Sequence, residues 1–463
     1  MSYISLTFAI FTAVLMAVFY LLPPKCRGWI LLLGSLGFYL CFDVRCVLFL
    51  LFTACTTYLG ALRLETSSNK KIITAVCVIL NAAVWFTIKE IPWLLKSVGR
   101  IGLQIDYSTA HWLVPVGISY YTLQAIGYLV DVSKGRITAE RSFWKYLLFL
   151  SWFPAIVQGP ISRYEQLMPQ LLNQKPYHFE RMRDHLVLIL FGLVKKMVVA
   201  DRLGIFVNTI FASFEEHYGV ILYLGAVGYA IQLYTDFSGC VDICRGVSGL
   251  FGVELVHNFN RPYLARSIKE FWGKWHMSLS GWLKDYVYIP LGGNRVSIWK
   301  NIRNIFVVWL LTGFWHGASW DFIAWGVYYG VLLLIEKFLL KDLKKMLPGL
   351  LNWLITAVLV LIGWVLFYYE DLGMGLQHLG IMFGFRNASL LDPATVYYFK
   401  HYLVMLVCAA LACLPWKAAT DKLPQTLRNT GAYLKPFAVT LIFLLALALI
   451  VGQSYNPFLY FRF

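Results

Sequence analysis

Residues 271–280 read FWGKWHMSLS, and residues 311–318 read LTGFWHGA. Each stretch places a histidine directly after a tryptophan, at His276 and His316, inside sequence that is otherwise apolar enough for a membrane. An ionisable group in such surroundings is costly, so its presence usually has a functional reason. We therefore look for chemistry in the block around these two pairs and for the fold in the rest of the chain.

The composition of the chain indicates a membrane protein. Of the 463 residues, 59% are hydrophobic and 14% are charged, against about 25% charged residues in a soluble domain. Several apolar runs are shorter than the ~20 residues of a straight crossing, which favours tilted or re-entrant segments. We predict an all-α polytopic membrane protein with roughly ten to twelve transmembrane helices plus re-entrant or interfacial helices. The clearest runs are Ile4–Leu22, Ile30–Phe42, Val47–Leu62, Ile72–Ile88, Trp112–Val130, Leu186–Ala200, Tyr218–Tyr234, Ile305–Phe314, Ile323–Leu340, Trp353–Tyr369, Tyr402–Leu414 and Phe437–Gly452.

The basic residues in the short loops predict how the chain is oriented. Loops with an excess of Lys and Arg face the cytoplasm, and on this rule the N-terminus and the C-terminus are both extracytoplasmic. The net charge of +16 then reflects topology and contact with anionic membrane lipids, and we predict no nucleic-acid partner. The loops that mark the cytoplasmic side carry Lys25, Arg27, Arg63, Lys70, Lys71, Lys134, Arg136, Arg141 and Lys145.

The chain is predicted to form one domain over residues 1–463, because no linker, low-complexity tract or soluble segment interrupts it. Its functional middle runs from about Trp152 to Trp325, where Pro154 and Pro160 break the helical pattern. We see no repeat of one half in the other, which weighs against an inverted-repeat transporter. The nine cysteines are scattered without metal-ligand spacing, so we predict neither a metal site nor a disulfide.

An aromatic stripe runs through the sequence around His276. Its members recur at steps of three and four, which predicts one helix with an aromatic face. Basic residues flank the stripe, so the helix either lies at the membrane interface or lines the wall of a funnel. The stripe consists of Trp272, Trp275, Leu279, Trp282 and Tyr286.

The two histidines are the candidates for acid–base chemistry. A neutral imidazole in a low-dielectric site can accept a proton near neutral pH, and His316 is followed by Gly317, which lets another group approach closely. On these grounds His316 is the primary base and His276 its supporting partner. The alternative, two buried histidines with packing roles, stays open from position and context alone.

Charged residues near the histidines have two interpretations each. Asp236 could orient a histidine, or it could form a structural ion pair in the membrane with Arg245. Arg261, Arg266 and Arg295 could hold the phosphates of an anionic donor, or they could be positive-inside anchors. No Walker A, dinucleotide-binding, HExxH or GxSxG pattern is present, so nucleotide hydrolysis and soluble-type hydrolase chemistry lack support.

Taken together, these motifs resemble the membrane-bound O-acyltransferase (MBOAT) family. The similarity extends over essentially the whole chain, and it is strongest to the bacterial branch with the alginate O-acetylation membrane protein and the peptidoglycan O-acetyltransferases. The segment Cys240–Cys244 departs from the usual pattern, although both histidines are retained. The matching stretches are Gly159–Tyr164, Lys195–Lys196, Ala200–Arg202, Asp236–Gly239, Arg261–Ile268, Phe271–Ser280, Trp282–Tyr286, Tyr288–Arg295, Leu311–Ala318 and Ser454–Phe463.

The resemblance implies an MBOAT fold around a central funnel, with His316 as the essential catalytic histidine and His276 as the second. It implies transfer of an acetyl group from a cytoplasmic donor, acetyl-CoA or another acyl thioester, toward an extracytoplasmic polysaccharide. It also implies an extracytoplasmic SGNH-type acetyltransferase partner, residence in the bacterial cytoplasmic membrane and no tightly bound cofactor. The supporting or donor-binding candidates are Trp275, Trp315, Asp236, Arg261, Asp285, Asn294 and Arg295.

Two rival functions remain open at this point. One is a teichoic-acid D-alanyl transfer protein, which the stretch YIPLGGNR at residues 288–295 makes the second choice. The other is a transporter or flippase for a lipid-linked sugar, which predicts repeat symmetry and buried charges spread along several helices. The polar residues of this chain cluster in one block instead, so we rank transport last.

Overall fold

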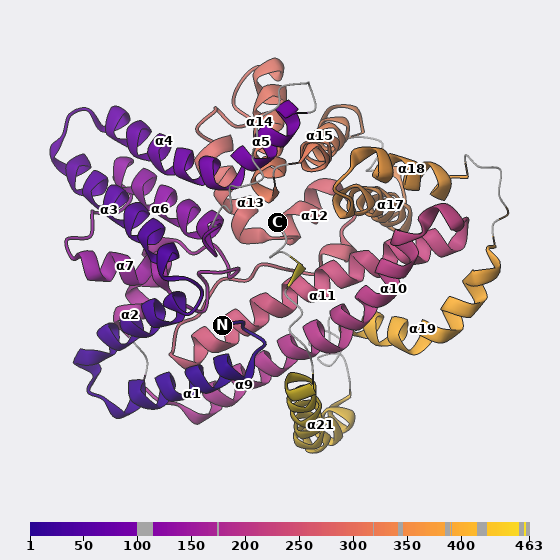
Figure 1. Ribbon diagram of the computed structural model, residues 1–463, viewed down its shortest axis with the longest axis horizontal. Coiled ribbons are helices and arrows are strands. Elements are labelled where there is room, and N and C mark those ends of the chain that lie inside the picture. The colour runs from indigo at the N-terminus through magenta and orange to yellow at the C-terminus, as the bar shows by residue number, and fades with distance from the viewer. Residues whose placement is uncertain are drawn as a thin grey trace.

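The computed structural model describes residues 1–99, 114–173, 176–317, 319–340, 346–384, 389, 391–413, 424–452 and 458–459. Within these residues every regular element is a helix, apart from an isolated bridge between Gly219 and Leu391. The predicted all-α fold class is therefore confirmed. Figure 1 shows the helices from the N-terminal part of the chain gathered on one side and those of the middle and C-terminal parts on the other.

The N-terminal helices pack around a core that they share with α9 (Phe179–Leu193) and the second half of the long helix α11 (Val220–Leu250). In this core the ring centroids of Phe8 and Phe38 lie 5.6 Å apart, and each of these two rings contacts both Tyr3 and Phe153 at centroid distances of 5.0 to 6.2 Å. Helix starts are fixed by side chains: Ser5, for example, accepts the backbone N–H of Phe8 at 3.2 Å. The helices of this group are α1 (Leu6–Leu21), α2 (Pro24–Leu40), α3 (Val44–Thr66), α4 (Lys70–Lys89), α5 (Ile91–Gly99), α6 (Ile118–Ser133) and α7 (Phe143–Ser151).

The longest helix is α11 (Val220–Leu250), which crosses the centre of the molecule (Figure 1). It packs against α9 (Phe179–Leu193), the π-helical turn η1 (Val194–Ala200) and α10 (Asp201–Ala212). The two helices α9 and α11 can cross closely because Gly192 has no side chain: a Cβ there would lie only 2.6 Å from the carbonyl oxygen of Gly239. The apolar run that ends near Tyr234 thus continues as helix for a further sixteen residues, to Leu250.

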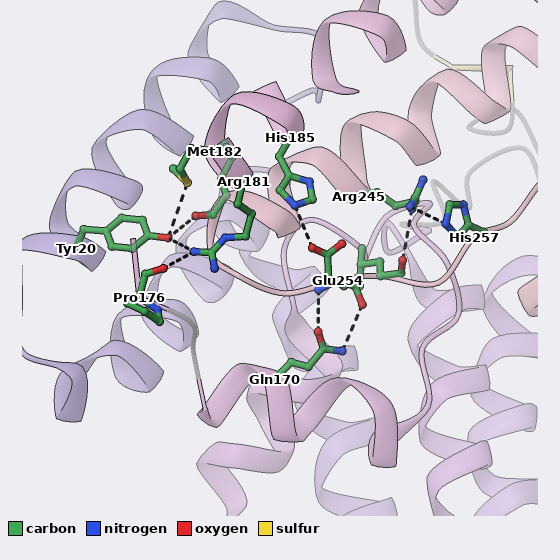
Figure 2. A network of polar contacts seen from close by, with 11 residues as sticks. Tyr20, Gln170, Pro176, Arg181, Met182, His185, Arg245, Glu254 and His257 are labelled. Atoms are coloured by element: carbon green, nitrogen blue, oxygen red, sulfur yellow. Dashed lines mark hydrogen bonds and ion pairs between the residues drawn. The ribbon is translucent and has the colours of Figure 1, made fainter. Parts of the chain in front are cut away.

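A polar network joins four parts of the fold at the Leu250 end of α11 (Figure 2). The hydroxyl of Tyr20 in α1 donates to the carbonyl of Leu250 at 2.7 Å. Glu254 bonds His185 of α9 at 3.1 Å and, through its backbone N–H, Gln170 of α8 (Tyr164–Leu172) at 2.8 Å. These bonds hold the extended segment that follows α11 and leads into residues 258–260.

His257 belongs to the same network. Burial lowers its pKa below the ordinary value, and the neighbouring Arg245 charge lowers it further. The neutral ring can therefore accept the Arg245 guanidinium N–H, whose nitrogen lies 3.1 Å from His257 Nε2. The last residue before Asn258 is thus tied to α11 (Figure 2).

The middle part of the chain contains a tight helix pair, α14 (Ile298–His316) and α15 (Trp320–Leu334). A Cβ on Gly313 would lie 2.2 Å from the carbonyl oxygen of Phe322, and one on Gly326 would lie 2.4 Å from that of Trp309. The two backbones meet where neither helix has a side chain. The remaining elements are η2 (Phe214–Glu216), η3 (Pro262–Leu264), α12 (Ile268–Lys274), α13 (Met277–Leu283), η4 (Lys284–Tyr288), η5 (Ile335–Leu339), α17 (Gly349–Tyr368), α18 (Leu372–Met382), α19 (Pro393–Ala412) and α21 (Gln425–Gly452).

Six of the described helices are long and apolar enough to cross a membrane. Two shorter apolar helices, Leu6–Leu21 and Pro436–Ile450, accompany them. Ten to twelve crossings in the whole chain therefore stays a prediction, since only the described residues count toward these six. The six are Val44–Thr66, Lys70–Lys89, Val220–Leu250, Trp320–Leu339, Gly349–Tyr368 and Pro393–Leu411.

Candidate active site around His276 and His316

The two histidines line one cavity. It has a volume of about 150 Å³ and lies between the α12–α13 region and α14. His276 is 2% exposed and His316 is 4% exposed, so both imidazoles are shielded from bulk solvent. The cavity is lined by Trp272, Trp275, His276, Leu279, Ser280, Leu283, Lys284, Tyr288, Val308, Trp309, Thr312 and His316.

His316 is the last residue of α14 and is surrounded by aromatic rings. The ring centroids of Trp325 and Phe367 lie 5.3 and 5.5 Å from the imidazole centroid, both edge-on. Helix α15 supplies Trp325, and α17 supplies Phe367. This packing fixes the plane of the imidazole and keeps the site in a low-dielectric environment.

His276 lies at a break between two helices. Its φ of 45° places it in the left-handed region, which is uncommon for a residue other than glycine and marks a position held by its surroundings. Neither ring nitrogen has a hydrogen-bond partner among the described residues, and the ring of Phe237 lies edge-on at 4.9 Å. Both nitrogens are therefore available to a bound substrate.

The break at His276 corrects the prediction of one continuous aromatic helix. The stripe is divided into α12, which ends at Lys274, and α13, which starts at Met277. Periodicity alone could not detect the change, because steps of three and four continue across it. The break turns His276 into the cavity while Trp272 and Leu279 stay on the cavity wall.

Asn258 holds this break in place and was not among the predicted site residues. Its backbone carbonyl accepts the N–H of Met277 at 2.9 Å, and its side-chain oxygen accepts the N–H of Ser278 at 2.9 Å. The residue is 1% exposed. It thus satisfies the first N–H groups of α13 from outside the helix, as a capping residue does. The polar sequence 258–263 pointed to this block but not to this role.

The two predicted tryptophans lie next to the histidines in different ways. The Trp315 ring contacts both imidazoles, 6.1 Å from His276 and 5.1 Å from His316 by ring centroids. Trp275 lines the cavity and packs against Phe271 and Trp364 at 5.7 and 4.9 Å. Neither indole has an acid–base group, so both have packing roles at the site.

Asp236 forms a buried ion pair, but its partner is Lys196 and not Arg245. Lys196 Nζ lies 2.7 Å from Asp236 and 2.8 Å from Asp201, while Arg245 approaches Asp242 at 3.8 Å. The close crossing of α9 and α11 brings Lys196 to Asp236, although forty residues separate them. The next residue, Phe237, contacts His276, so the pair supports the site from outside the cavity.

The other predicted polar residues lie outside the cavity. Asp285 pairs with Arg163 at 2.7 Å. Arg261 and Arg295 are exposed, and neither forms an ion pair with a described residue. Asn294 accepts a hydrogen bond from the Tyr288 hydroxyl at 2.6 Å, which connects it to the cavity wall.

Two lysines give the Tyr288 end of the cavity a positive charge. Lys284 lines the cavity and is exposed. Lys337 donates to Asn294 at 2.5 Å and to Asn301 at 2.6 Å, both of which also bond the Tyr288 hydroxyl. Neither lysine has a carboxylate partner within the described parts of the chain. The family resemblance did not mark Lys337, because its partners lie 36 and 43 residues away.

Comparison with known proteins gives this geometry a family. The model of the membrane-bound O-acyltransferase family matches residues 137–376, which contain both histidines and the whole cavity. The chain is 32% identical to the "Probable alginate O-acetylase AlgI" of Azotobacter vinelandii, over 98% of each chain. It is 33% identical to the "Peptidoglycan O-acetyltransferase" of Helicobacter pylori, over 78% of this chain and 74% of that one.

A further relative comes from another branch. The "Teichoic acid D-alanyltransferase" of Bacillus subtilis is 31% identical, over 57% of this chain and 70% of its own length. The match to the alginate O-acetylase is thus more extensive than the match to the D-alanyltransferase. The chain belongs to the membrane-bound O-acyltransferase family, and it is a multi-pass membrane acyltransferase.

Proposed function

We propose that this protein passes an acetyl group from a cytoplasmic thioester donor to the extracytoplasmic side, where an envelope polysaccharide is O-acetylated. The observation that carries the proposal is one buried cavity that holds two histidines from different elements and has an unneutralised cationic end. The names of the relatives that match 98% and 78% of this chain support acetyl as the transferred group.

The chemistry follows from the state of the two imidazoles. In direct transfer, a neutral histidine accepts the proton of the incoming hydroxyl, the oxygen attacks the acyl carbon, and the carbon–sulfur bond breaks. The proton then passes to the departing thiolate, which leaves as the free thiol. In the two-step route the imidazole nitrogen attacks first and carries the acetyl group before the hydroxyl receives it. Both routes require an imidazole nitrogen without a competing hydrogen bond, as His276 has.

The cationic end of the cavity suits an anionic donor. Lys284 and Lys337 lack carboxylate partners among the described residues, so their charge is available to a phosphate group. Acetyl-CoA carries such phosphates at the end remote from its thioester. We infer that these two lysines receive the donor. By the positive-inside rule, we expect their end of the cavity to face the cytoplasm.

The acceptor side involves a second protein in our proposal. The two imidazoles are almost fully shielded from solvent, at 2% and 4% exposed, so we propose that the polymer does not reach them directly. An extracytoplasmic acetyltransferase of the SGNH type would collect the acetyl group and place it on the glycan. The bacterial cytoplasmic membrane is the corresponding location, with both termini on the extracytoplasmic side.

D-Alanyl transfer to teichoic acid is the second candidate, because relatives of that name match more than half of this chain. It uses the same two histidines and differs in the group that is carried. The lower coverage places it behind O-acetylation. Transport of a lipid-linked sugar has no support from the family.

The test is the ester-acetate content of the cell envelope in a deletion strain. The strain is complemented with the wild type, with His316→Ala, or with His401→Ala, which changes an exposed histidine on α19. We expect the wild type and His401→Ala to restore ester acetate and His316→Ala not to, at matched protein levels in the membrane. Restoration by His316→Ala would reject the catalytic assignment. A change in D-alanine esters in place of acetate would favour the second candidate.

A further inference from the structure

The C-terminal end of α4 clamps the C-terminal end of α14. Phe86 stacks on Phe314 with ring centroids 5.8 Å apart, and Trp85 meets the same ring edge-on at 5.9 Å. Lys89, the last residue of α4, donates to the backbone carbonyl of Trp315 at 3.0 Å. Three residues of the N-terminal helices therefore hold the turn that ends in His316, although more than 220 positions separate them in the chain.

The bond to Trp315 has a clear physical role. The last carbonyls of a helix have no partner within the helix, and the helix dipole makes that end negative. A lysine ammonium satisfies the carbonyl and complements the dipole at once. It does so one residue before His316 and on the residue whose ring contacts both histidines.

The Lys89 ammonium bonds a backbone carbonyl and is not drawn into an ion pair with a described carboxylate. Its neighbour Glu90 is buried, with no hydrogen bond to either carboxylate oxygen, and the two side chains interact through their charges without a direct contact. The ammonium also lies close enough to His316 for its charge to act on the imidazole. A half-buried ammonium beside the reacting group is costly to desolvate, which indicates a role beyond packing.

We propose that Lys89 is a positioning residue for acyl transfer: its ammonium fixes the end of α14 and thereby sets the position of His316 relative to His276. This inference rests on the proposed function, because it assumes that the two histidines handle the acetyl group. It assigns to the N-terminal helices a part in the chemistry, which the family model starting at residue 137 does not include.

The test compares Lys89→Met and Lys89→Arg with Lys145→Met as the matched control. Lys145 lies over the Trp144 ring at 5.9 Å, much as Lys89 lies over the Trp85 ring at 6.0 Å, but no described contact links it to the cavity. The full chain is purified in detergent, and release of free thiol from acetyl-CoA is measured at several donor concentrations with a deacetylated envelope oligosaccharide present as the hydroxyl acceptor. The donor-binding lysines lie at the other end of the cavity, so a positioning defect alters kcat and spares KM.

We expect Lys89→Met to lower kcat at least tenfold with KM within twofold of the wild type. Lys89→Arg, which keeps the charge and the donor, should recover most of the rate, and Lys145→Met should match the wild type. Unchanged kcat in Lys89→Met, or a change in KM alone, overturns the inference. So does a failure of Lys89→Arg to recover activity when its thermal stability equals that of the wild type.

Two controls keep the outcome decisive. If Lys89→Met does not accumulate as folded protein, Lys89→Gln, which retains a donor without the charge, is judged by the same kcat criterion. If the wild type itself releases no thiol from acetyl-CoA, the proposed function fails and not the role of Lys89. An active wild type together with a fully active Lys89→Met rejects only the positioning role.

Discussion

At the residue scale, the two histidines could be predicted from the sequence and the residues that position them could not. The Trp-His pairs stand out because ionisable groups are rare in such apolar surroundings. Asn258 and Lys89 act through hydrogen bonds to backbone atoms, at Ser278 and Trp315. A backbone donor or acceptor leaves no trace in the identity of its own residue, so the sequence shows only the side-chain partner of each contact.

Replacement of Asn258 should loosen His276. In Asn258→Ala the N–H of Ser278 loses its acceptor, which costs about 1 kcal/mol and releases the left-handed conformation of His276. We expect roughly a tenfold loss of acetyl transfer, since a catalytic group must be held within about 0.5 Å of its working position. Thiol release from acetyl-CoA by purified protein measures the effect. Asn260→Ala is the control, because Asn260 is exposed and bonds only through its backbone; equal losses in both variants would contradict the capping role.

At the scale of elements, apolar runs predicted where most described helices lie, but not where polar residues would end them. The helix around Tyr234 continues through Asp236 and Asp242 because Lys196 and Lys195 neutralise these carboxylates at 2.7 and 2.6 Å. The aromatic stripe, in contrast, breaks at His276 where its periodicity gives no sign. In both places the deciding partner lies in another segment of the chain, which a local pattern does not reach.

The buried Lys196 should be the most sensitive charge in this part of the fold. Lys196→Met leaves the carboxylates of Asp236 and Asp201 buried without their cation, and breaking such a group costs about 3–5 kcal/mol. We expect little folded protein in detergent extracts, as measured by size-exclusion chromatography and thermal denaturation. Lys195→Met should be milder, because Lys195 and Asp242 are 20% and 15% exposed. Recovery in Lys196→Met/Asp201→Asn/Asp236→Asn would assign the loss to charge, and no recovery would assign it to shape.

At the scale of the whole molecule, two lysines without a carboxylate partner among the described residues, Lys284 and Lys337, stand at the Tyr288 end of the cavity. In the proposed function they receive an anionic donor. Electrostatic attraction of this kind raises the local concentration of an anion and weakens as salt is added. The basic cytoplasmic face that the sequence predicted stays a prediction.

Removal of these charges should weaken donor binding and leave the chemical step intact. In Lys284→Gln/Lys337→Gln we expect KM for acetyl-CoA to rise about tenfold, which corresponds to about 1.4 kcal/mol, with kcat within twofold. The increase should shrink when the salt concentration is raised from about 0.05 to 0.5 M, because screening already suppresses the attraction in the wild type. Thiol release at varied acetyl-CoA concentration measures both constants. A loss of kcat at constant KM would show that the lysines act on catalysis instead.

The orientation of the molecule can be tested with its own cysteines. Cys26 and Cys41 are exposed and lie at opposite ends of α2. The positive-inside rule places Cys26, between Lys25 and Arg27, in the cytoplasm and Cys41 on the other side. In single-cysteine variants, a membrane-impermeant maleimide added to spheroplasts should label Cys41 and not Cys26. The reverse pattern would invert the proposed topology and, with it, the side from which the donor enters.

The paired glycines of α14 and α15 have a consequence for how the molecule can move. Gly313 lies against the Phe322 carbonyl, and Gly326 lies against the Trp309 carbonyl. Neither helix can therefore rotate about its own axis without a clash with the backbone of the other. His316 on α14 and Trp325 on α15 therefore belong to one rigid helix pair, and a movement of one residue would move the other. Alternating access usually depends on the movement of one helix bundle against another. The contact between α14 and α15 does not allow such a movement. In the proposed function, therefore, the acetyl group moves past two helices that stay in place.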